Sequence, residues 1–237
     1  MSILDVEHVF FYYGKRRALC DVTFHTDENE IIGLLGLNGA GKTTCLRMLA
    51  GLAAPNSGTI RLQGQDVYRK IPTASIGFMP EGLDPELRVE ELLDFRARLC
   101  GFVSHQQRRQ EIERLVDLCQ VSTFSRRFAG ELSTGMRQRV ALAWALCGSP
   151  KLVLLDEPSF GLDPHQQRIL RDIIKSAASN ACVMVSSHGL DELARIANRF
   201  LVLHEGQLLH DGTCPSESLL DFFLDITTRA TTPKGEP

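Results

Sequence analysis

The chain has 237 residues and a net charge of −3 at neutral pH, so it is long enough for one large hydrophobic core and lacks the basic excess of a nucleic-acid-binding protein. Its seven cysteines are odd in number and none is spaced as C-x-x-C, which argues against a disulfide framework or a zinc site and favours reduced core residues of a cytosolic protein. No apolar run approaches the length of about twenty residues that spans a bilayer, and the N-terminus lacks a signal-peptide layout, so another chain must supply any membrane-spanning part.

The first part of the chain predicts strands. Residues 1 to about 30 alternate apolar and polar side chains, which indicates antiparallel strands. The apolar positions of this alternation are Val6, Val9, Phe11, Val22 and Phe24. The apolar run over residues 30–35 predicts a buried strand, and residues 43–50 predict a helix.

Between that strand and that helix lies a glycine-rich segment, Gly36-Leu37-Asn38-Gly39-Ala40-Gly41-Lys42-Thr43, which matches G-x-x-x-x-G-K-[ST]. Its glycines let the backbone curl so that successive N–H groups point at one anion, and the positive end of the following helix faces the same point. We expect Lys42 to reach the β- and γ-phosphates of a nucleotide, and the Thr43 hydroxyl to bind Mg²⁺. A chance glycine-rich turn is the alternative, but it does not require a strand before it and a helix after it. The expected nucleotide-binding residues of this loop are Asn38, Gly39, Ala40, Gly41, Lys42, Thr43 and Thr44.

The middle of the chain, from about residue 84 to 146, has a helical and charged pattern. Within residues 111–119, four apolar side chains recur at helical spacing on one face: Ile112, Leu115, Val116 and Cys119. The apolar run from Val140 to Cys147 predicts a buried core helix. We therefore expect a helical subdomain over residues 84–146.

Two carboxylates follow the next apolar run, Leu152-Val153-Leu154-Leu155-Asp156-Glu157. A continuous apolar run is typical of a parallel strand covered on both faces, and ligands bind beyond the carboxyl ends of such strands. We expect Asp156 to hold Mg²⁺, directly or through water, and Glu157 to polarise an attacking water molecule. A solvated acidic turn before Pro158 would explain the pair alone, but not the buried strand that leads into it.

Further strands are predicted over residues 183–185, 200–203 and 207–209, the last two joined through a turn at Glu205-Gly206. Residues 215–226 predict a short terminal helix. Residues 227–237 have the composition of a flexible tail.

Taken together and in this order, these motifs resemble those of the ATP-binding cassette (ABC) ATPases. The resemblance implies that Tyr13 stacks on adenine, that Leu132-Ser133-Thr134-Gly135-Met136 is the signature loop, and that His188 is the switch histidine that contacts the γ-phosphate. It also implies that residues 158–163 cross between two subunits. The implied fold is a single α/β domain over residues 1–237, with a P-loop NTPase core and parallel central sheet, an N-terminal antiparallel β subdomain and a helical subdomain.

The same resemblance implies a mechanism and partners. Two identical ATPase subunits pair head to tail, with Ser133 and Gly135 of one subunit closing on the ATP at Lys42 of the other. Glu157, His188 and Lys42 are the implied catalytic residues, and ATP with Mg²⁺ is the implied substrate and cofactor. A separate transmembrane permease subunit holds the pair at the cytoplasmic face of the membrane.

Two positions depart from the usual family pattern. Glu81 follows Pro80 where glutamine is usual, and the signature loop has Thr134 and Met136 in place of glycine and glutamine. Both departures, and the sequence Gly135-Met136-Arg137-Gln138-Arg139, resemble the corresponding segments of the ATPases of bacterial ABC-2-type exporters. The position of Glu81 implies that its carboxylate lies near Mg²⁺ and the attacking water.

Several alternatives stay open from the sequence. Tyr13 follows Phe10, Phe11 and Tyr12, so it could serve only strand packing, and a lone histidine such as His188 is usually a satisfied polar residue. Ser133 is also a favoured residue for capping the next helix. The whole chain could instead be a soluble cassette ATPase that acts on ribosomes or DNA, or a regulatory subunit that binds nucleotide and hardly hydrolyses it.

Overall fold

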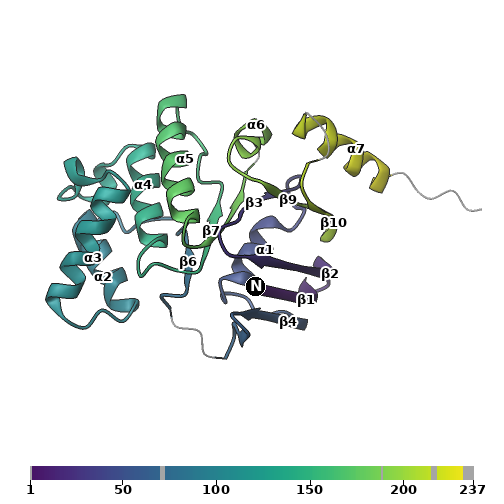
Figure 1. Ribbon diagram of the computed structural model, residues 1–237, viewed down its shortest axis with the longest axis horizontal. Helices are drawn as coiled ribbons and strands as arrows, with labels where there is room; N and C mark the ends of the chain where they lie inside the picture. The colour runs from purple at the N-terminus through teal and green to yellow at the C-terminus, as the bar shows by residue number, and fades with distance from the viewer. Residues whose placement is uncertain (1, 70–72, 188, 215–217, 232–237) are drawn as a thin grey trace, which may run out of the picture.

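The computed structural model of the chain describes residues 2–69, 73–187, 189–214 and 218–231, and consists of two sheets with helices around them and a separate helical subdomain at one end (Figure 1). Within these ranges, every helix is too short or too polar to span a bilayer. Every strand and helix given below lies in the described part of the chain.

The N-terminal sheet is antiparallel and has the strand order β2-β1-β4-β5. Along β1 and β2 the apolar side chains Val6, Val9, Val22 and Phe24 are buried, as their alternation predicts, because successive side chains of a strand point to opposite faces. The antiparallel strands predicted for residues 1–30 are therefore confirmed. The four strands are β1 (Ser2–Tyr13), β2 (Arg16–Asp27), β4 (Ser57–Leu62) and β5 (Gln65–Asp66).

The central sheet has the order β10-β9-β3-β8-β7-β6, and all its pairs are parallel except the β10–β9 edge. The residues of β3 and β8 are buried throughout, as expected for strands covered on both faces. The α/β fold with a mainly parallel central sheet is thus confirmed. The strands are β3 (Ile31–Leu35), β6 (Ile76–Phe78), β7 (Leu152–Asp156), β8 (Cys182–Ser186), β9 (Arg199–His204) and β10 (Gln207–Gly212).

The helices form two groups, and α2, α3 and α4 make up the helical subdomain at the left of Figure 1. The face predicted for residues 111–119 is confirmed: Leu115 and Cys119 are fully buried, and Ile112 and Val116 pack partly buried against the same core. The helices are α1 (Lys42–Leu49), α2 (Val89–Leu99), α3 (His105–Leu118), α4 (Thr134–Ala145), α5 (Pro164–Ala178), α6 (Leu190–Ala194) and α7 (Leu219–Thr231). Two 3₁₀ turns, η1 (Ser122–Phe124) and η2 (Ala129–Glu131), precede α4.

The C-terminal helix α7 continues beyond its predicted end at residue 226, and the prediction of a flexible tail from residue 227 is wrong for residues 227–231. The buried Thr227 explains the difference, because its hydroxyl donates to the carbonyl oxygen of Phe223 at 2.8 Å, and Phe223 itself packs in the core. The predicted start at residue 215 and the rest of the predicted tail, residues 232–237, lie outside the described residues.

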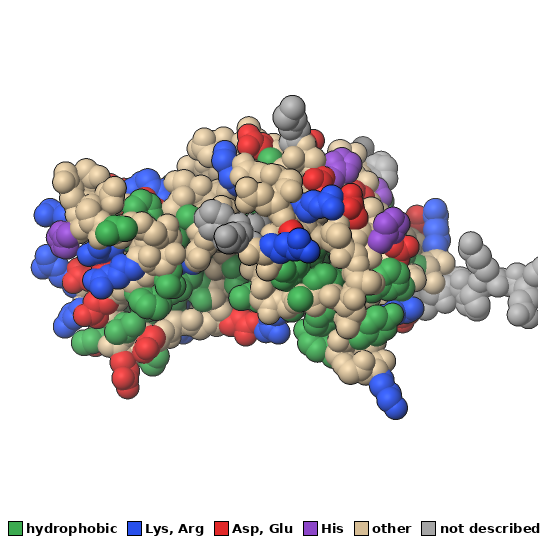
Figure 2. Space-filling view, turned by 90° about the horizontal axis from the view of Figure 1, so that it is seen from below, with side chains coloured by type: hydrophobic (Ala, Val, Ile, Leu, Met, Phe, Trp, Pro, Cys, Tyr) green, Lys and Arg blue, Asp and Glu red, His purple; other side chains and the backbone are tan. Residues whose placement is uncertain are grey.

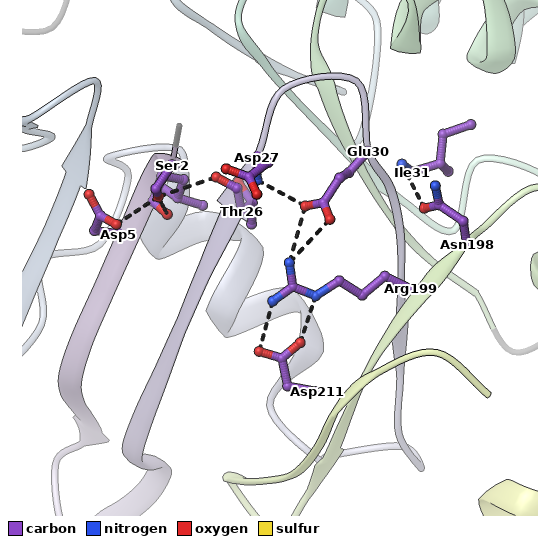
Figure 3. Close-up of polar contacts among 10 residues, drawn as sticks. Ser2, Asp5, Thr26, Asp27, Glu30, Ile31, Asn198, Arg199 and Asp211 are labelled. Atoms are coloured by element: carbon purple, nitrogen blue, oxygen red, sulfur yellow. Dashed lines mark hydrogen bonds and ion pairs between the residues drawn. The ribbon is translucent and has the colours of Figure 1, made fainter. Parts of the chain in front are cut away.

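Arg199, a largely buried cation on β9, joins β9 and the edge strand β10 to the start of β3 (Figure 3). The Arg199 guanidinium donates to both carboxylate oxygens of Asp211, at 2.7 and 2.9 Å, and to both of Glu30, at 3.1 and 3.3 Å. Asp211, then Glu30, raise the pKa of Arg199, which is only 15% exposed. Planar, bidentate pairs of this kind combine strength with fixed geometry, so the pair fixes β9 and β10 against the strand that leads into the glycine-rich loop.

Candidate functional site

The glycine-rich loop connects β3 to α1, as the sequence predicts, and Gly41 is the N-cap of α1 with φ 110°. A Cβ atom on Gly41 would lie 2.7 Å from the Ala18 carbonyl oxygen and 2.8 Å from a methyl carbon of Leu19, so only glycine fits. No side chain caps the N-terminus of α1. Its first N–H groups, which an α-helix leaves without internal partners, therefore suit an anionic ligand.

Lys42 places a buried ammonium inside this loop. Its Nζ donates to the carbonyl oxygens of Gly36 at 2.7 Å and Leu37 at 3.3 Å. Burial lowers the pKa of Lys42, and the nearby carboxylates of Glu157 and Asp156 act in the opposite direction. A lysine charge that is costly in the free protein becomes favourable when phosphate oxygens contact it.

Asp156 ends β7 and Glu157 follows it, at the same edge of the sheet. The Ser186 hydroxyl, at the end of the neighbouring β8, donates to the Asp156 carboxylate. The Glu157 N–H group lies 3.2 Å from the Ser186 carbonyl oxygen and 3.1 Å from its hydroxyl. Glu157 has φ 49°, a left-handed conformation that residues other than glycine rarely adopt and that recurs at functional sites. Both side chains line the same cavity, and both carboxylates act on the charge of Lys42.

A cavity of about 700 Å³ brings most of the predicted residues together. It lies where the carboxyl ends of parallel strands meet, the usual position for a ligand in such a sheet. Its lining contains the predicted residues Tyr13, Asn38, Gly39, Gly41, Lys42, Thr43, Thr44, Glu81, Asp156 and Glu157. The predicted residue Ala40 is buried behind this surface. The lining also contains seven residues outside that predicted set: Arg16, Arg17, Ala18, Met79, Pro80, Gln138 and Phe160.

Ser133 and Gly135 lie elsewhere, at the N-terminus of α4. The Ser133 hydroxyl accepts from the Met136 N–H at 3.3 Å, so the capping role considered for it is confirmed. Gly135 faces the side chain of Gln166 on α5. Neither belongs to the lining of the cavity. His188 lies outside the described residues.

Tyr13 ends β1 at the mouth of the cavity and is 51% exposed. Its hydroxyl is 3.5 Å from that of Thr44, and Phe11 contacts the ring at a centroid distance of 4.9 Å in a T-shaped arrangement. The neighbouring Tyr12 is exposed but does not line the cavity. Because about half of the Tyr13 side chain is exposed and the ring borders the cavity, its position favours base stacking over strand packing.

Glu81 also lines the cavity, after β6, and its carboxylate pairs with the guanidinium of Arg47 from α1. Glu81 is the largest cause of the raised pKa of Arg47, and Tyr13 adds to it. Arg47 was not singled out from the sequence. The only available signal was its position on the helix one turn after Thr43, which brings it beside the loop.

The residues of the cavity fit ATP with Mg²⁺. The Thr43 hydroxyl and the Asp156 carboxylate line the same space, and both are the hard oxygen ligands that Mg²⁺ prefers. In the described part of the chain, no group of three or more His, Cys, Asp or Glu side chains could hold a metal. Because Mg²⁺ binds through few carboxylates together with phosphate and water oxygens, such a sparse set suits it.

Comparisons with known proteins point the same way. The ABC transporter family profile matches residues 19–160. The chain is 36% identical over 216 residues to the Nod factor export ATP-binding protein I of Paraburkholderia xenovorans, covering 89% of this chain and 71% of that protein. It is 34% identical over 212 residues to an uncharacterized ABC transporter ATP-binding protein of Bacillus subtilis, covering 89% and 70% of the two chains.

Solved structures agree with this likeness. An ATP-binding subunit of an ABC transporter superposes with a TM-score of 0.86 at 28% identity, covering 95% of this chain and 99% of that one. A dimeric ATP-binding cassette in a post-hydrolysis state, bound to ADP and Pi, shares the fold with a TM-score of 0.80 at 23% identity over 90% of this chain and 99% of that one.

The position of Tyr13 generates a testable prediction. Tyr13→Ala should weaken ATP binding by about 1–3 kcal/mol, the range for a base stacked on an aromatic ring. Tyr13→Phe should change it little, because the ring face makes the contact and the 3.5 Å approach to Thr44 is long for a hydrogen bond between hydroxyls. Isothermal titration calorimetry with ATP measures both, and Tyr12→Ala is the matched control. Normal binding by Tyr13→Ala would leave strand packing as the role of the ring.

Proposed function

This chain belongs to the ABC transporter family as an ATP-binding subunit, and we propose that it binds and hydrolyses ATP to drive an ABC-2-type exporter whose membrane path a separate permease supplies. The observation that carries the proposal is the cavity that joins the glycine-rich loop, Lys42, Thr43 and the two carboxylates of β7. The proposed direction of transport, export, rests on the relatives named for Nod factor export and on the sequence motif at residues 135–139.

The residues of the cavity divide the chemistry among them. The loop N–H groups and the Lys42 ammonium bind the β- and γ-phosphates and offset the charge that develops on them, while Tyr13 stacks on the adenine. Thr43 and Asp156 hold Mg²⁺, which when bound adds positive charge beside the transferring phosphoryl group. Glu157 accepts a proton from water and orients it for in-line attack on the γ-phosphate. The resemblance to the ABC ATPases adds His188, which lies outside the described residues, as the proposed contact to the γ-phosphate.

The proposed active unit is a head-to-tail pair of identical subunits. The support is that Ser133 and Gly135, at the start of α4, do not line the cavity of their own chain. An N-terminus of a helix favours a phosphate, so these two residues are suited to close on the ATP bound by the other copy. Phe160 is 74% exposed at the cavity mouth, where a second subunit would cover it. The pair is thereby held by ATP and loosened by hydrolysis.

The surface proposed to meet the permease is next to Glu81. A cavity of about 290 Å³ lies between the loop after β6 and the helical subdomain, and it is mostly apolar. Hydrophobic side chains also gather over the helical subdomain, at the left of Figure 2. On α2 and in the loop that follows it, Phe95, Leu99 and Val103 are exposed. Docking there would place the subunit at the cytoplasmic face of the membrane. The lining of the cavity is Pro80, Gly82, Leu83, Asp84, Leu87, Leu92, Phe95 and Trp144.

Purification from the native membrane tests the whole proposal. The tagged chain should bring down a polytopic membrane protein in stoichiometric amount, and the complex should release phosphate from ATP in a Mg²⁺-dependent reaction. Recovery of ribosomes or nucleic acid in place of a membrane protein would contradict the proposal. A membrane complex that binds ATP without releasing phosphate would indicate a regulatory subunit instead.

The proposed role of Glu157 predicts a separation of binding from hydrolysis. Glu157→Gln should keep ATP affinity, lower hydrolysis by about a hundredfold or more and trap an ATP-bound dimer, because the amide cannot take the proton from water. Phosphate release and size-exclusion chromatography with multi-angle light scattering measure the two effects. Glu90→Gln, at an exposed position on α2 in the helical subdomain, is the control. Hydrolysis at the wild-type rate by Glu157→Gln would remove Glu157 from this role.

The proposed place of Glu81 predicts low activity for the isolated subunit and stimulation by the permease. An ionised carboxylate accepts but does not donate hydrogen bonds, and it adds negative charge beside the γ-phosphate. Glu81→Gln should raise the basal rate about fivefold, since one unit charge across solvent is worth about 1 kcal/mol, and it should weaken the response to the permease. Glu86→Gln is the control in the same loop.

The assay compares phosphate release by the isolated subunit and by the reconstituted complex. Equal basal rates and equal stimulation for Glu81→Gln and the wild type would show that the Arg47 ion pair holds Glu81 away from the nucleotide throughout the cycle.

A further inference from the structure

Two cysteines face one another in the helical subdomain, away from the nucleotide cavity. Cys100 is the C-cap of α2, and Cys147 follows the C-terminal end of α4, which packs against α2. The Sγ atom of Cys100 lies 3.5 Å from the Cys147 carbonyl oxygen, although 47 positions separate the two residues in sequence. Cys100 is partly exposed and Cys147 is fully buried behind it, so a solvent-borne reagent meets Cys100 first.

The charges around Cys100 favour its thiolate. Arg96, one helical turn earlier on α2, is 7% exposed. Its guanidinium donates to three carbonyl oxygens at 3.3–3.4 Å, those of Trp144, Thr73 and Ile76. Its positive charge therefore remains available to a neighbouring anion. Glu111 acts in the opposite direction, as does the negative end of α2, but the Glu111 carboxylate is bound by Arg114 at 2.6 and 2.8 Å.

The other cysteines provide a contrast within the same chain. The Cys147 side chain is the largest cause that lowers the pKa of Cys100, to about 7, with Arg96 adding to it and burial opposing it. Burial raises the pKa of Cys45, Cys119 and Cys182 to about 12. A thiol that is partly exposed, has a pKa near neutral pH and lies next to a second cysteine has the properties of a reactive redox cysteine.

We propose that Cys100 and Cys147 form a peroxide-responsive pair, in which Cys100 is the reactive thiol and Cys147 resolves it into a disulfide. The Cys100 thiolate attacks one oxygen of hydrogen peroxide, the O–O bond breaks, and the sulfur is oxidised to a sulfenic acid while hydroxide leaves and takes a proton from solvent to become water. The Cys147 thiol then attacks that sulfur, the S–O bond breaks, and a second water leaves as the disulfide forms. A cellular dithiol reductant reverses the reaction.

The disulfide would join the C-terminal ends of α2 and α4, two helices of the same subdomain. Ser133 is the N-cap of α4, and α2 follows the loop that contains Glu81. The disulfide would therefore join the helix that Ser133 caps to the helix that follows Glu81. The proposal rests on the thiol pair alone and is independent of the transport function.

Peptide mapping after peroxide treatment of the full chain tests the pair. At neutral pH the wild type should lose the mass of two hydrogen atoms and yield one Cys100–Cys147 cross-linked peptide, which dithiothreitol reverses. Cys147→Ser should accumulate a sulfenic acid on Cys100 that dimedone traps, and Cys100→Ser should form no cross-link. Cys20→Ser and Cys214→Ser, which replace the other partly exposed cysteines, are the matched controls and should react as the wild type does.

Alkylation of the reduced protein gives a second readout that does not require a variant. The rate of iodoacetamide labelling at Cys100 should rise with pH through about 7, because the thiolate is the nucleophile. A labelling rate at Cys100 that does not rise through this pH range would overturn the proposal. A stable sulfenic acid on Cys100 of the wild type, with no cross-link to Cys147, would overturn it as well.

Discussion

A buried ammonium at the start of a helix is the constraint on which the site depends. The Nζ atom of Lys42 is held by carbonyl oxygens of a loop that passes so close to Ala18 that Gly41 can carry no side chain. Burial of this charge is unfavourable in the free chain, as the lowered pKa of Lys42 shows. The fold therefore maintains an unfavourable charge that a phosphate group can relieve, which is a direct way to convert the binding of ATP into a structural change.

The remaining parts of the fold place the counterparts of that charge. Parallel pairing of β3, β8 and β7 brings the ends of these strands to one edge, so that Asp156 and Glu157 face the loop from across the cavity. At the other end of β3, Arg199 holds Glu30 and Asp211 and so fixes the strand that leads into the loop. The antiparallel sheet contributes Tyr13 at the rim. Each layer thus supplies one contact to the same cavity.

The local parts of this arrangement could be predicted from the sequence because they depend on short patterns. The glycine-rich loop, the buried strands and the carboxylate pair are each encoded within about ten residues, and the structure brings them together as predicted. The alternation of residues 1–30 predicts antiparallel strands for the same reason. Helix α7 ends later than the sequence predicts. The residues after Ile226 are polar, but Thr227 among them is buried and its hydroxyl donates to the Phe223 carbonyl oxygen of the same helix.

Contacts between distant segments could not be predicted from such patterns. The pairing of Glu81 with Arg47 and the approach of Cys100 to Cys147 depend on how distant segments pack together. A local sequence pattern does not predict such packing. Arg16 and Arg17 reach the cavity only because β2 lies against the loop. The role of Ser133 as a helix cap could be predicted from its residue type, whereas its separation from the cavity of its own chain was implied only by the resemblance to the ABC ATPases.

The central claim is that each ATP is enclosed by Lys42 of one copy and Ser133 of another, and a mixing experiment tests it. Ser133→Asp retains a helix N-cap while placing a negative charge against the γ-phosphate, so it should be inactive without unfolding α4, and Lys42→Ala should also be inactive. In a mixture of the two, a heterodimer contains one intact site. Random pairing should therefore restore roughly a quarter of the wild-type hydrolysis per site. A mixture as inactive as its two components would contradict the shared site.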